Sequence, residues 1–279
     1  TLHDAYKKIT SLDERTNYKM VHEYPLGGKP PMMTHVFKNA KGKRIIAAKG
    51  APEAIMAVSN LTPSEIKIIQ ETLVNLGKDG YRMLAVGKAV FDEDTYPEKQ
   101  QDVKFDFKGI VSFYDPPKDN ISQVLKDFES AGIKVKLVTG DNANTAMAIA
   151  KQINFKGYEK CISGDELMKL TDAELQEKVK HINVFSRMFP DAKLRIVNAL
   201  KKNNEVVAMT GDGVNDGPAL KASHIGIAMG KKGTEIAKQA ASLILVDDDL
   251  SKMVDAVAMG RKIYTNLKKA IQYIISIHI

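Results

Sequence analysis

A chain of 279 residues can form one large domain or two medium ones, each with its own core. Its 44% hydrophobic and 27% charged residues are ordinary for a soluble globular protein, and we find no signal peptide, repeat, low-complexity segment or bilayer-spanning stretch. The net charge is +7, but we find no nucleic-acid-binding module in which aromatic residues are interleaved with basic ones, which argues against nucleic-acid binding. The positive charge instead favours solubility, an anionic ligand or an anionic membrane face. The single cysteine, Cys161, excludes an internal disulfide and is typical of a reducing compartment.

The first 106 residues are expected to form an α+β domain. Apolar runs at 33–38 and 44–49 predict a hairpin around Asn39-Ala40-Lys41-Gly42. Thr62 and Glu65 form a capping box around Pro63, so a helix is expected from there to about Gly77. The other expected elements are a frayed helix at 1–9, a strand at 18–21, a loop at 26–31, a helix starting at Pro52, a strand at 83–91 and a charged connection at 92–106.

From residue 107 onward, strands alternate with amphipathic helices. This alternation predicts a parallel sheet with helices on both faces, whose functional loops lie at the carboxyl ends of the strands. The expected strands are 109–113, 135–139, 184–186, 206–210, 225–229 and 243–246, with helices at 120–131, 143–154 and 190–202.

The segment 205–220, Glu-Val-Val-Ala-Met-Thr-Gly-Asp-Gly-Val-Asn-Asp-Gly-Pro-Ala-Leu, organises this second part. A buried strand opens into a loop whose glycines allow close approach to a phosphate. Its two acids, Asp212 and Asp216, would repel a bare phosphate, so we expect Mg²⁺ as the third participant. An ordinary Gly/Asp turn is the alternative, and the glycine spacing does not match a dinucleotide fingerprint or a P-loop.

The string Thr-Gly-Asp-Gly-Val-Asn-Asp at 210–216 resembles the hinge motif of the P-type cation-transporting ATPases, whose phosphorylation domain has the haloacid-dehalogenase-like fold. The resemblance runs from about Met32 to the C-terminus and is greatest to the calcium-transporting branch of type II. It implies that Asp212 binds Mg²⁺ and that Asn215 hydrogen-bonds the phosphoryl group. It also implies that Asp216 helps to hold the metal shell and a lysine.

Lys49 and Gly50 begin a second matching string, Lys-Gly-Ala-Pro-Glu. In the family this lysine lines the adenine pocket, and Arg82 resembles an arginine that contacts the nucleotide phosphates; a solvated lysine and a surface arginine are the alternatives. The chain departs from the family where Leu26 replaces a stacking aromatic residue and where prolines 30 and 31 replace a basic pair. Losing a stacked ring costs about 1–3 kcal/mol, so either ATP binds more weakly or the pocket is built differently.

Three further motifs resemble the family's phosphate-handling residues. Thr139 and Gly140 end a strand and can hold phosphoryl oxygens at a helix N-terminus, while Asp141 either helps to bind nucleotide or caps the helix. Lys193 lies in the first turn of an expected helix, where its charge opposes the helix macrodipole. The resemblance implies that Lys193 neutralises the charge on the phosphorylated aspartate. Lys118 stands in place of the arginine of Asp-Pro-Pro-Arg; a rigid turn is the alternative there.

The last segment, 249–279, is expected to be one helix roughly 46 Å long. Basic residues precede ten mostly apolar ones, too few to span the bilayer but typical of a cytoplasmic approach to it. The resemblance places the fifth transmembrane helix here, so we interpret the segment as a stalk; a core-packing terminal helix is the alternative.

The family's phosphorylated aspartate lies in Asp-Lys-Thr-Gly-Thr, and this string is absent from the sequence. Two groups of acids follow expected strands and could be substitutes. The spacing of the motif rules out the acids at 92–94, and the order of the motifs in the chain rules out those at 247–249. We therefore expect a fragment that is soluble by itself and forms no phosphoenzyme.

The expected parts are an incomplete nucleotide-binding domain at 1–106, a phosphorylation domain at 107–248 that lacks its first strand, and a stalk at 249–279. In the intact pump the partners would be ATP, Mg²⁺, a transported cation and the membrane, with no nucleic acid. Thr139, Lys193 and Asp212 should meet at one edge of a single sheet. A free-standing haloacid-dehalogenase-like phosphatase and a non-catalytic nucleotide-binding protein are the alternatives.

Overall fold

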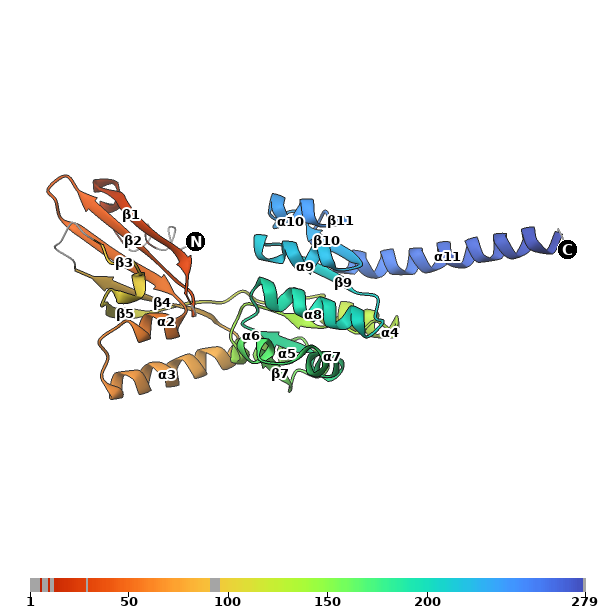
Figure 1. The fold of residues 1–279 in the computed structure, drawn as a ribbon, viewed down its shortest axis with the longest axis horizontal. Helices are drawn as coiled ribbons and strands as arrows, with labels where there is room; N and C mark the ends of the chain where they lie inside the picture. Colours follow the sequence, from red (N-terminus) through yellow and green to blue (C-terminus); the bar gives the residue numbers. More distant parts are fainter. Residues whose placement is uncertain (1–5, 7–9, 11–12, 29, 91–95, 278–279) are drawn as a thin grey trace. The chain divides into compact units, whose positions relative to one another are not determined.

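The computed structural model describes residues 6, 10, 13–28, 30–90 and 96–277 (Figure 1). The chain divides into two compact units, Thr1–Asp115 and Pro116–Ile279. The division falls after residue 115, whereas the change in sequence pattern led us to expect it after residue 106. The expected helix at 1–9 lies almost entirely outside the described residues, as do the acids at 92–94.

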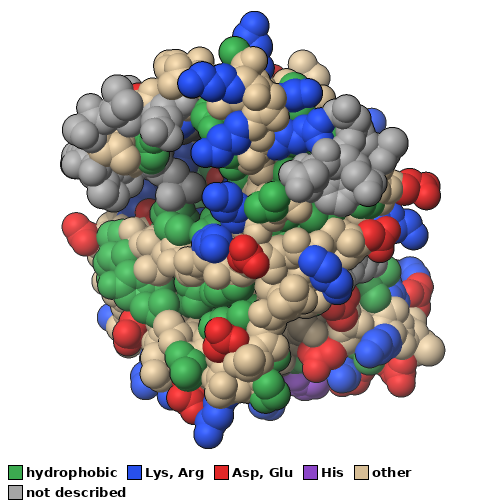
Figure 2. Space-filling view, turned by 90° about the vertical axis from the view of Figure 1, so that its left-hand side faces the viewer, with side chains coloured by type: hydrophobic (Ala, Val, Ile, Leu, Met, Phe, Trp, Pro, Cys, Tyr) green, Lys and Arg blue, Asp and Glu red, His purple; other side chains and the backbone are tan. Residues whose placement is uncertain are grey.

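Positive charge is unevenly spread over the face drawn in Figure 2. On the face drawn in Figure 2, Lys and Arg side chains gather toward the top of the view, and a hydrophobic patch lies at its left. Such a local excess of positive charge attracts anionic ligands more strongly than the net charge alone indicates.

The first unit contains a five-stranded antiparallel sheet in the order β1-β2-β3-β4-β5. Its β2–β3 hairpin is confirmed: the backbone N–H of Gly42 donates to the carbonyl of Asn39 at 3.0 Å, and Gly42 has a positive φ of 81° that favours glycine. The strands are β1 (Tyr18–Gly27), β2 (Met32–Asn39), β3 (Arg44–Gly50), β4 (Arg82–Ala89) and β5 (Asp106–Phe113).

Two expectations for this unit were wrong. Strand β1 continues to Gly27, so the segment from Leu26 is not loop from its start. The strand predicted at 109–113 does not belong to a parallel sheet, because β5 pairs antiparallel with β4. None of the β5 side chains is buried, whereas parallel strands are normally buried on both faces. The apolar run predicted a strand correctly but carried no information about its partner.

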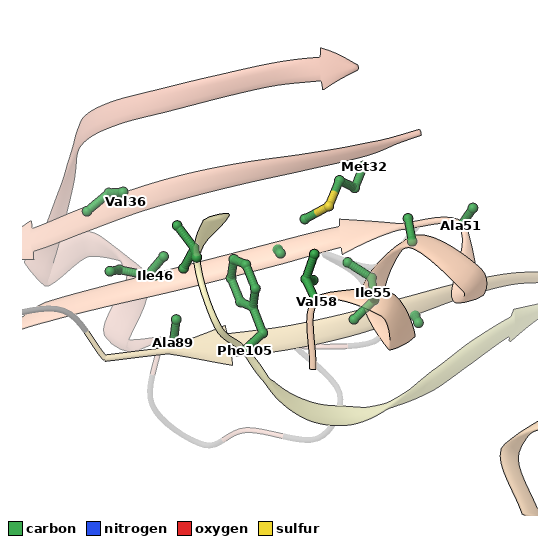
Figure 3. Close-up of a cluster of buried hydrophobic side chains, with 12 residues drawn as sticks. Met32, Val36, Ile46, Ala51, Ile55, Val58, Ala89 and Phe105 are labelled. Atoms are coloured by element: carbon green, nitrogen blue, oxygen red, sulfur yellow. The ribbon is translucent and has the colours of Figure 1, made fainter. Parts of the chain in front are cut away.

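One face of this sheet carries the core of the unit. The buried side chains of β2, β3 and β4 point toward helix α2 (Pro52–Ala57) and toward Phe105, which is fully buried (Figure 3). As predicted, Pro52 begins α2, and the capping box of Thr62 and Glu65 begins α3 (Pro63–Lys78). The described part of the unit also contains two short 3₁₀ turns, at Glu14–Asn17 and Gln100–Asp102.

The second unit contains parallel strands with helices around them, which confirms the α/β class. Its helices are α4 (Ile121–Ser130), α5 (Ala143–Gln152), α6 (Gly164–Met168), α7 (Asp172–His181), α8 (Pro190–Lys202), α9 (Gly217–Ala222), α10 (Glu235–Ala240) and α11 (Ser251–Ile277), with a 3₁₀ turn, η3, at Val214–Asp216. Its strands are β6 (Leu137–Val138), β7 (Cys161–Ser163), β8 (Val184–Ser186), β9 (Ala208–Gly211), β10 (Ile225–Met229) and β11 (Leu243–Leu245).

These strands form two sheets, ordered β6-β8-β7 and β11-β10-β9, and not the single sheet that we expected. Helix α8 packs against both: Ile196 belongs to a cluster with Val138 of β6, and Val197 to a cluster with Met209 of β9. Within the described part of the chain, β6 and β9 each have a neighbouring strand on one side only. The alternation of strands and helices in the sequence predicted the strands but not the break between the two sheets.

Helix α11 confirms the expected C-terminal helix. Its 27 residues extend about 40 Å, and none of its side chains is buried, which argues against a core-packing helix. Asp249 begins the helix by accepting a hydrogen bond from the N–H of Ser251, and the Arg261 guanidinium donates to the carbonyl of Ala131 at the end of α4. No helix in the described ranges has both the length and the hydropathy to cross a bilayer.

Candidate active site

The Gly/Asp loop lies where β9 ends and η3 begins. The Asp216 carboxylate turns back beneath this loop and accepts hydrogen bonds from the backbone N–H groups of Asp212 at 3.2 Å and Gly213 at 3.0 Å. Glycine is required at position 211, because a Cβ there would lie 2.5 Å from the Cβ of Asp216. The backbone of the loop therefore folds around the carboxylate of Asp216, a residue of the same segment.

Lys193 supplies the charge that this carboxylate needs. Its Nζ lies 2.6 Å from Oδ1 of Asp216, and the two side chains are only 14% and 8% exposed. Lys193 extends from the first turn of α8, where the helix dipole disfavours a cation, so the ion pair compensates for an unfavourable position. Breaking so buried a pair by removing one partner typically costs about 3–5 kcal/mol.

Asp212 differs from Asp216 in exposure and in bonding. Its side chain is exposed, and its carboxylate has no hydrogen-bond or ion-pair partner among the residues that the structure describes. Its backbone carbonyl accepts a 2.8 Å hydrogen bond from the N–H of Thr234. Asn215 lies in η3, also with an exposed side chain.

The donor set at this loop is compatible with Mg²⁺. No group of three or more His, Cys, Asp or Glu side chains in the described ranges could hold a metal. Mg²⁺ commonly uses one or two carboxylates and keeps several waters, so the unpartnered carboxylate of Asp212 suits it. Both oxygens of Asp216 are already bonded within the protein, which suits a supporting position around the metal's water shell.

The loop after β6 brings Thr139 and Asp141 together. The Thr139 hydroxyl donates to Oδ2 of Asp141 at 3.0 Å and accepts from the N–H of Asp141 at 3.1 Å. Asp141 does not cap the following helix: Asn142 caps α5 by accepting from the N–H of Thr145, which corrects that alternative. A Cβ on Gly140 would meet no atom within 4 Å, so the space beside Gly140 is open.

This loop is attached to the segment that leads into α8. The N–H of Arg187 donates to the carbonyl of Asp141, and the N–H of Met188 donates to the carbonyl of Thr139. Backbone hydrogen bonds therefore tie the Thr139 loop to the segment just before the helix of Lys193. No hydrogen bond or ion pair between described residues joins Thr139 directly to Lys193 or Asp212.

The side chain of Lys118 is used in a hydrogen bond within the protein. Its Nζ donates to the backbone carbonyl of Asp248, the residue that precedes the turn into α11. The lysine that replaces the family's arginine thus connects the start of α4 to the start of α11.

In the first unit, Lys49 and Arg82 share the sheet face opposite the core. Lys49 pairs directly with Val86, four residues along β4 from Arg82, so the two side chains lie about 13 Å apart along the strand direction. Gly50 points toward the core, where a Cβ would lie 2.6 Å from the Cβ of Met32. Gly50 is thus required for packing, whereas the side chains of Lys49 and Arg82 are exposed.

A surface pocket of about 420 Å³ lies away from these motifs, between α7 and α8. Its Arg195 and Lys202 side chains both pair with the carboxylate of Asp172, so much of its charge is compensated. It contains none of the residues that the sequence singled out, and the remaining lining residues are Leu175, Gln176, Asn198, Ala199 and Lys201.

Sequence reasoning missed Asp248, whose carboxylate accepts the N–H groups of Lys231 and Lys232, each at 3.0 Å. Burial opposes its ionisation, but the amides of residues 230–232 and the Lys118 charge outweigh burial and hold the pKa of Asp248 below its usual range. The run of three aspartates after a strand was the available signal, and we considered it only as a source of nucleophiles.

Comparison with known proteins identifies relatives that match most of the chain. Residues 22–224 match the family model described as haloacid dehalogenase-like hydrolase. The chain is 37% identical to "Calcium-transporting ATPase" of Bacillus subtilis over 94% of its length and 34% identical to "Calcium-transporting ATPase 1" of Saccharomyces cerevisiae over 95%. It is 36% identical over 77% of its length to the human "Calcium-transporting ATPase type 2C member 1".

The relatives are much longer than this chain. The matches cover 31% of the Bacillus protein, 30% of the yeast protein and 22% of the human protein.

Proposed function

Because the chain belongs to the haloacid dehalogenase-like hydrolases and is related to calcium-transporting ATPases over nearly all of its length, we propose that it is the ATP-binding and phosphorylation portion of a P-type cation pump. The relatives confirm the resemblance to this family. Calcium is the ion that we propose, since the relatives carry it in their names. The portion would lie at the cytoplasmic face of a membrane protein.

One observation carries this proposal: the buried Lys193–Asp216 ion pair beneath the exposed carboxylate of Asp212. Phosphoryl transfer depends mainly on positioning and on stabilising negative charge. We assign Asp212 to the metal, Lys193 to charge neutralisation, and Asp216 to holding the lysine and the metal's water shell. Mg²⁺, when bound, supplies neutralisation of the phosphoryl oxygens.

We assign roles to the remaining candidate residues from the resemblance to the pumps and from their local geometry. The Thr139 hydroxyl and the Gly140 amide would hold phosphoryl oxygens in the open space beside Gly140. Asn215 would donate to the same group, and Asp141 would contact the nucleotide. The reaction would transfer the γ-phosphoryl group of ATP to an aspartate carboxylate, giving an acyl phosphate and ADP.

The aspartate itself would lie on a further strand between β6 and β9. Both strands have an unpaired side in the described chain, and both lie under α8. A parallel strand inserted there would join the two sheets, and its carboxyl end would emerge beside the loops of Thr139 and Asp212. An acid at that end would lie close to Lys193.

The nucleotide would bind on the open sheet face of the first unit. The separation of Lys49 and Arg82 on one face suits a ligand with a base at one end and phosphates at the other. Leu26 is 65% exposed and provides no aromatic ring for stacking, so we expect modest ATP affinity.

Calorimetric titration with ATP tests this assignment. We expect Lys49→Gln to weaken binding about fivefold or more, because the ammonium near the nucleotide is lost. Lys43→Gln is the matched control: Lys43 is exposed in the β2–β3 turn, at the other end of β3, and the substitution removes the same charge. Equal effects of the two substitutions would show that only net charge matters and would remove the nucleotide site from this face.

A further inference from the structure

Asp248 is an inward-facing acid that the proposed reaction does not use. It follows β11 and is only 8% exposed, and its φ of 56° lies in the left-handed region that Asp tolerates better than most residues. Its Oδ1 accepts the N–H of Lys231 and its Oδ2 accepts the N–H of Lys232, while its backbone carbonyl accepts Nζ of Lys118. The two hydrogen bonds from the N–H groups of Lys231 and Lys232 to this carboxylate, which we call the clamp, hold the start of the loop between β10 and α10.

This loop has little freedom to move. A Cβ on Gly230 would lie 2.7 Å from Cα of Val246, and a Cβ on Gly233 would lie 1.9 Å from the carbonyl oxygen of Met229. The N–H of Gly230 also donates to the carbonyl of Leu245 at 2.9 Å. The loop is thus packed backbone to backbone against the ends of β10 and β11.

The far end of the same loop reaches the candidate metal site. The N–H of Thr234 donates to the carbonyl of Asp212 at 2.8 Å, and the Thr234 hydroxyl caps α10 by accepting from the N–H of Ala237. Only two residues lie between Lys231, which is held by Asp248, and Thr234, which holds Asp212. The loop is a short, tightly packed connection between a buried carboxylate and an exposed one.

We propose that Asp248 is a positioning residue for Asp212, acting through the segment 230–234 to hold the metal-binding carboxylate in place. The inference rests on the proposed function, because it takes Asp212 as the Mg²⁺ ligand. A carboxylate that accepts two backbone N–H groups makes charge-assisted hydrogen bonds, which are stronger than neutral ones. Residues that hydrogen-bond a metal ligand directly typically change metal affinity about 10–100-fold when they are altered, and we expect the lower end of this range for Asp248, which acts through the loop.

The test compares Asp248→Asn with Asp247→Asn. The first substitution keeps the shape of the side chain but turns an NH₂ group toward one of the two N–H donors. Asp247 belongs to the same turn, is exposed and pairs with Lys231 at 3.5 Å, so its substitution removes the same charge without touching the clamp. Paramagnetic broadening of the amides of residues 211–216 by Mn²⁺ measures binding, and amide exchange of Thr234 measures the loop.

We expect Asp248→Asn to weaken Mn²⁺ binding about tenfold or more. The same variant should speed exchange of the Thr234 amide by a similar factor, and Asp247→Asn should change each less than twofold. Mn²⁺ binding in Asp248→Asn equal to that in Asp247→Asn would overturn the inference. Asp212→Asn tests the proposed metal site separately from the role of Asp248. If that variant binds Mn²⁺ normally, the proposed metal site is wrong. If it fails to bind Mn²⁺, the metal site stands and the Asp248 result decides the inference.

A measurement on the unaltered chain covers the case in which Asp248→Asn fails to fold. Coupling between two sites is reciprocal, so Mg²⁺ at Asp212 should stabilise the clamp at Asp248. Saturating Mg²⁺ should slow exchange of the Lys231 and Lys232 amides severalfold. Unchanged exchange at both amides, with Asp212 occupied, would show that the two carboxylates are independent.

Discussion

Two glycines in the proposed phosphate-binding motifs, Gly211 and Gly140, differ in their surroundings. At Gly211 a Cβ would lie 2.5 Å from the Cβ of Asp216, whereas at Gly140 a Cβ would meet no atom within 4 Å. We expect Gly211→Ala to lower the free energy of unfolding by about 1–3 kcal/mol, as overpacking does. Gly140→Ala should change it by no more than about 0.5 kcal/mol, the usual range for an open surface position.

Urea unfolding of the two variants measures this difference. Equal stability would contradict the packing of the Asp216 carboxylate beneath Gly211 and, with it, the closed form of the loop. A stable Gly140→Ala variant would also show that any loss of phosphate binding at that position comes from crowding of the ligand rather than from misfolding.

The sequence did not predict the individual environments of the candidate site residues. Asp212 and Asp216 belong to one seven-residue string, yet one carboxylate is exposed and the other is buried against Lys193. Similarly, Asp141 and Asn142 are adjacent polar residues, and only the backbone path determines that Asn142 is the cap. These differences depend on where each chain segment turns, which local composition does not fix.

At the scale of elements, three of the described α-helices begin with capping boxes, and these should be sensitive to acid. In α7 the Glu174 carboxylate accepts from the N–H and hydroxyl of Thr171, each at 2.8 Å. The hydrogen bond from the Thr171 amide, followed by that from its hydroxyl, lowers the pKa of Glu174. The same arrangement starts α3 and α6.

Because the folded-state pKa of Glu174 is lowered, its contribution to stability is present above the unfolded pKa, near 4.5, and is lost as the pH falls through the folded value. We expect the amides of the first turn of α7 to exchange faster as the pH falls below about 4.5, after correction for intrinsic rates. Glu174→Gln keeps a capping-box side chain but does not titrate, so its exchange should not show this step. A step of the same size in Glu174→Gln would assign the effect to another group.

Several elements matched their prediction residue for residue, including β8 at 184–186 and β10 at 225–229. Apart from the β2–β3 hairpin, the sequence did not predict which strands pair. The run at 109–113 forms an edge strand of an antiparallel sheet, and β6 and β9 belong to different sheets. Periodicity reports the burial of one strand, whereas strand order depends on segments distant in sequence.

At the scale of the whole molecule, the two units carry complementary parts of one proposed reaction. The first presents Lys49 and Arg82 on an open sheet face, and the second carries the loops of Thr139 and Asp212 with Lys193. The family match at 22–224 includes residues of both units. The unpaired sides of β6 and β9 in the described chain mark the position that we propose for the strand with the phosphorylated aspartate.

Phosphoenzyme formation tests the account most directly. The chain would be extended by the coding sequence that precedes it in its gene, and both forms would be incubated with γ-labelled ATP and Mg²⁺. We predict an acid-stable, hydroxylamine-labile label on the extended protein, its loss in Asp212→Asn and Lys193→Ala, and no label on the 279-residue chain. A labelled 279-residue chain, or an extended protein that remains unlabelled, would contradict the assignment of this chain to the phosphorylation machinery of a pump.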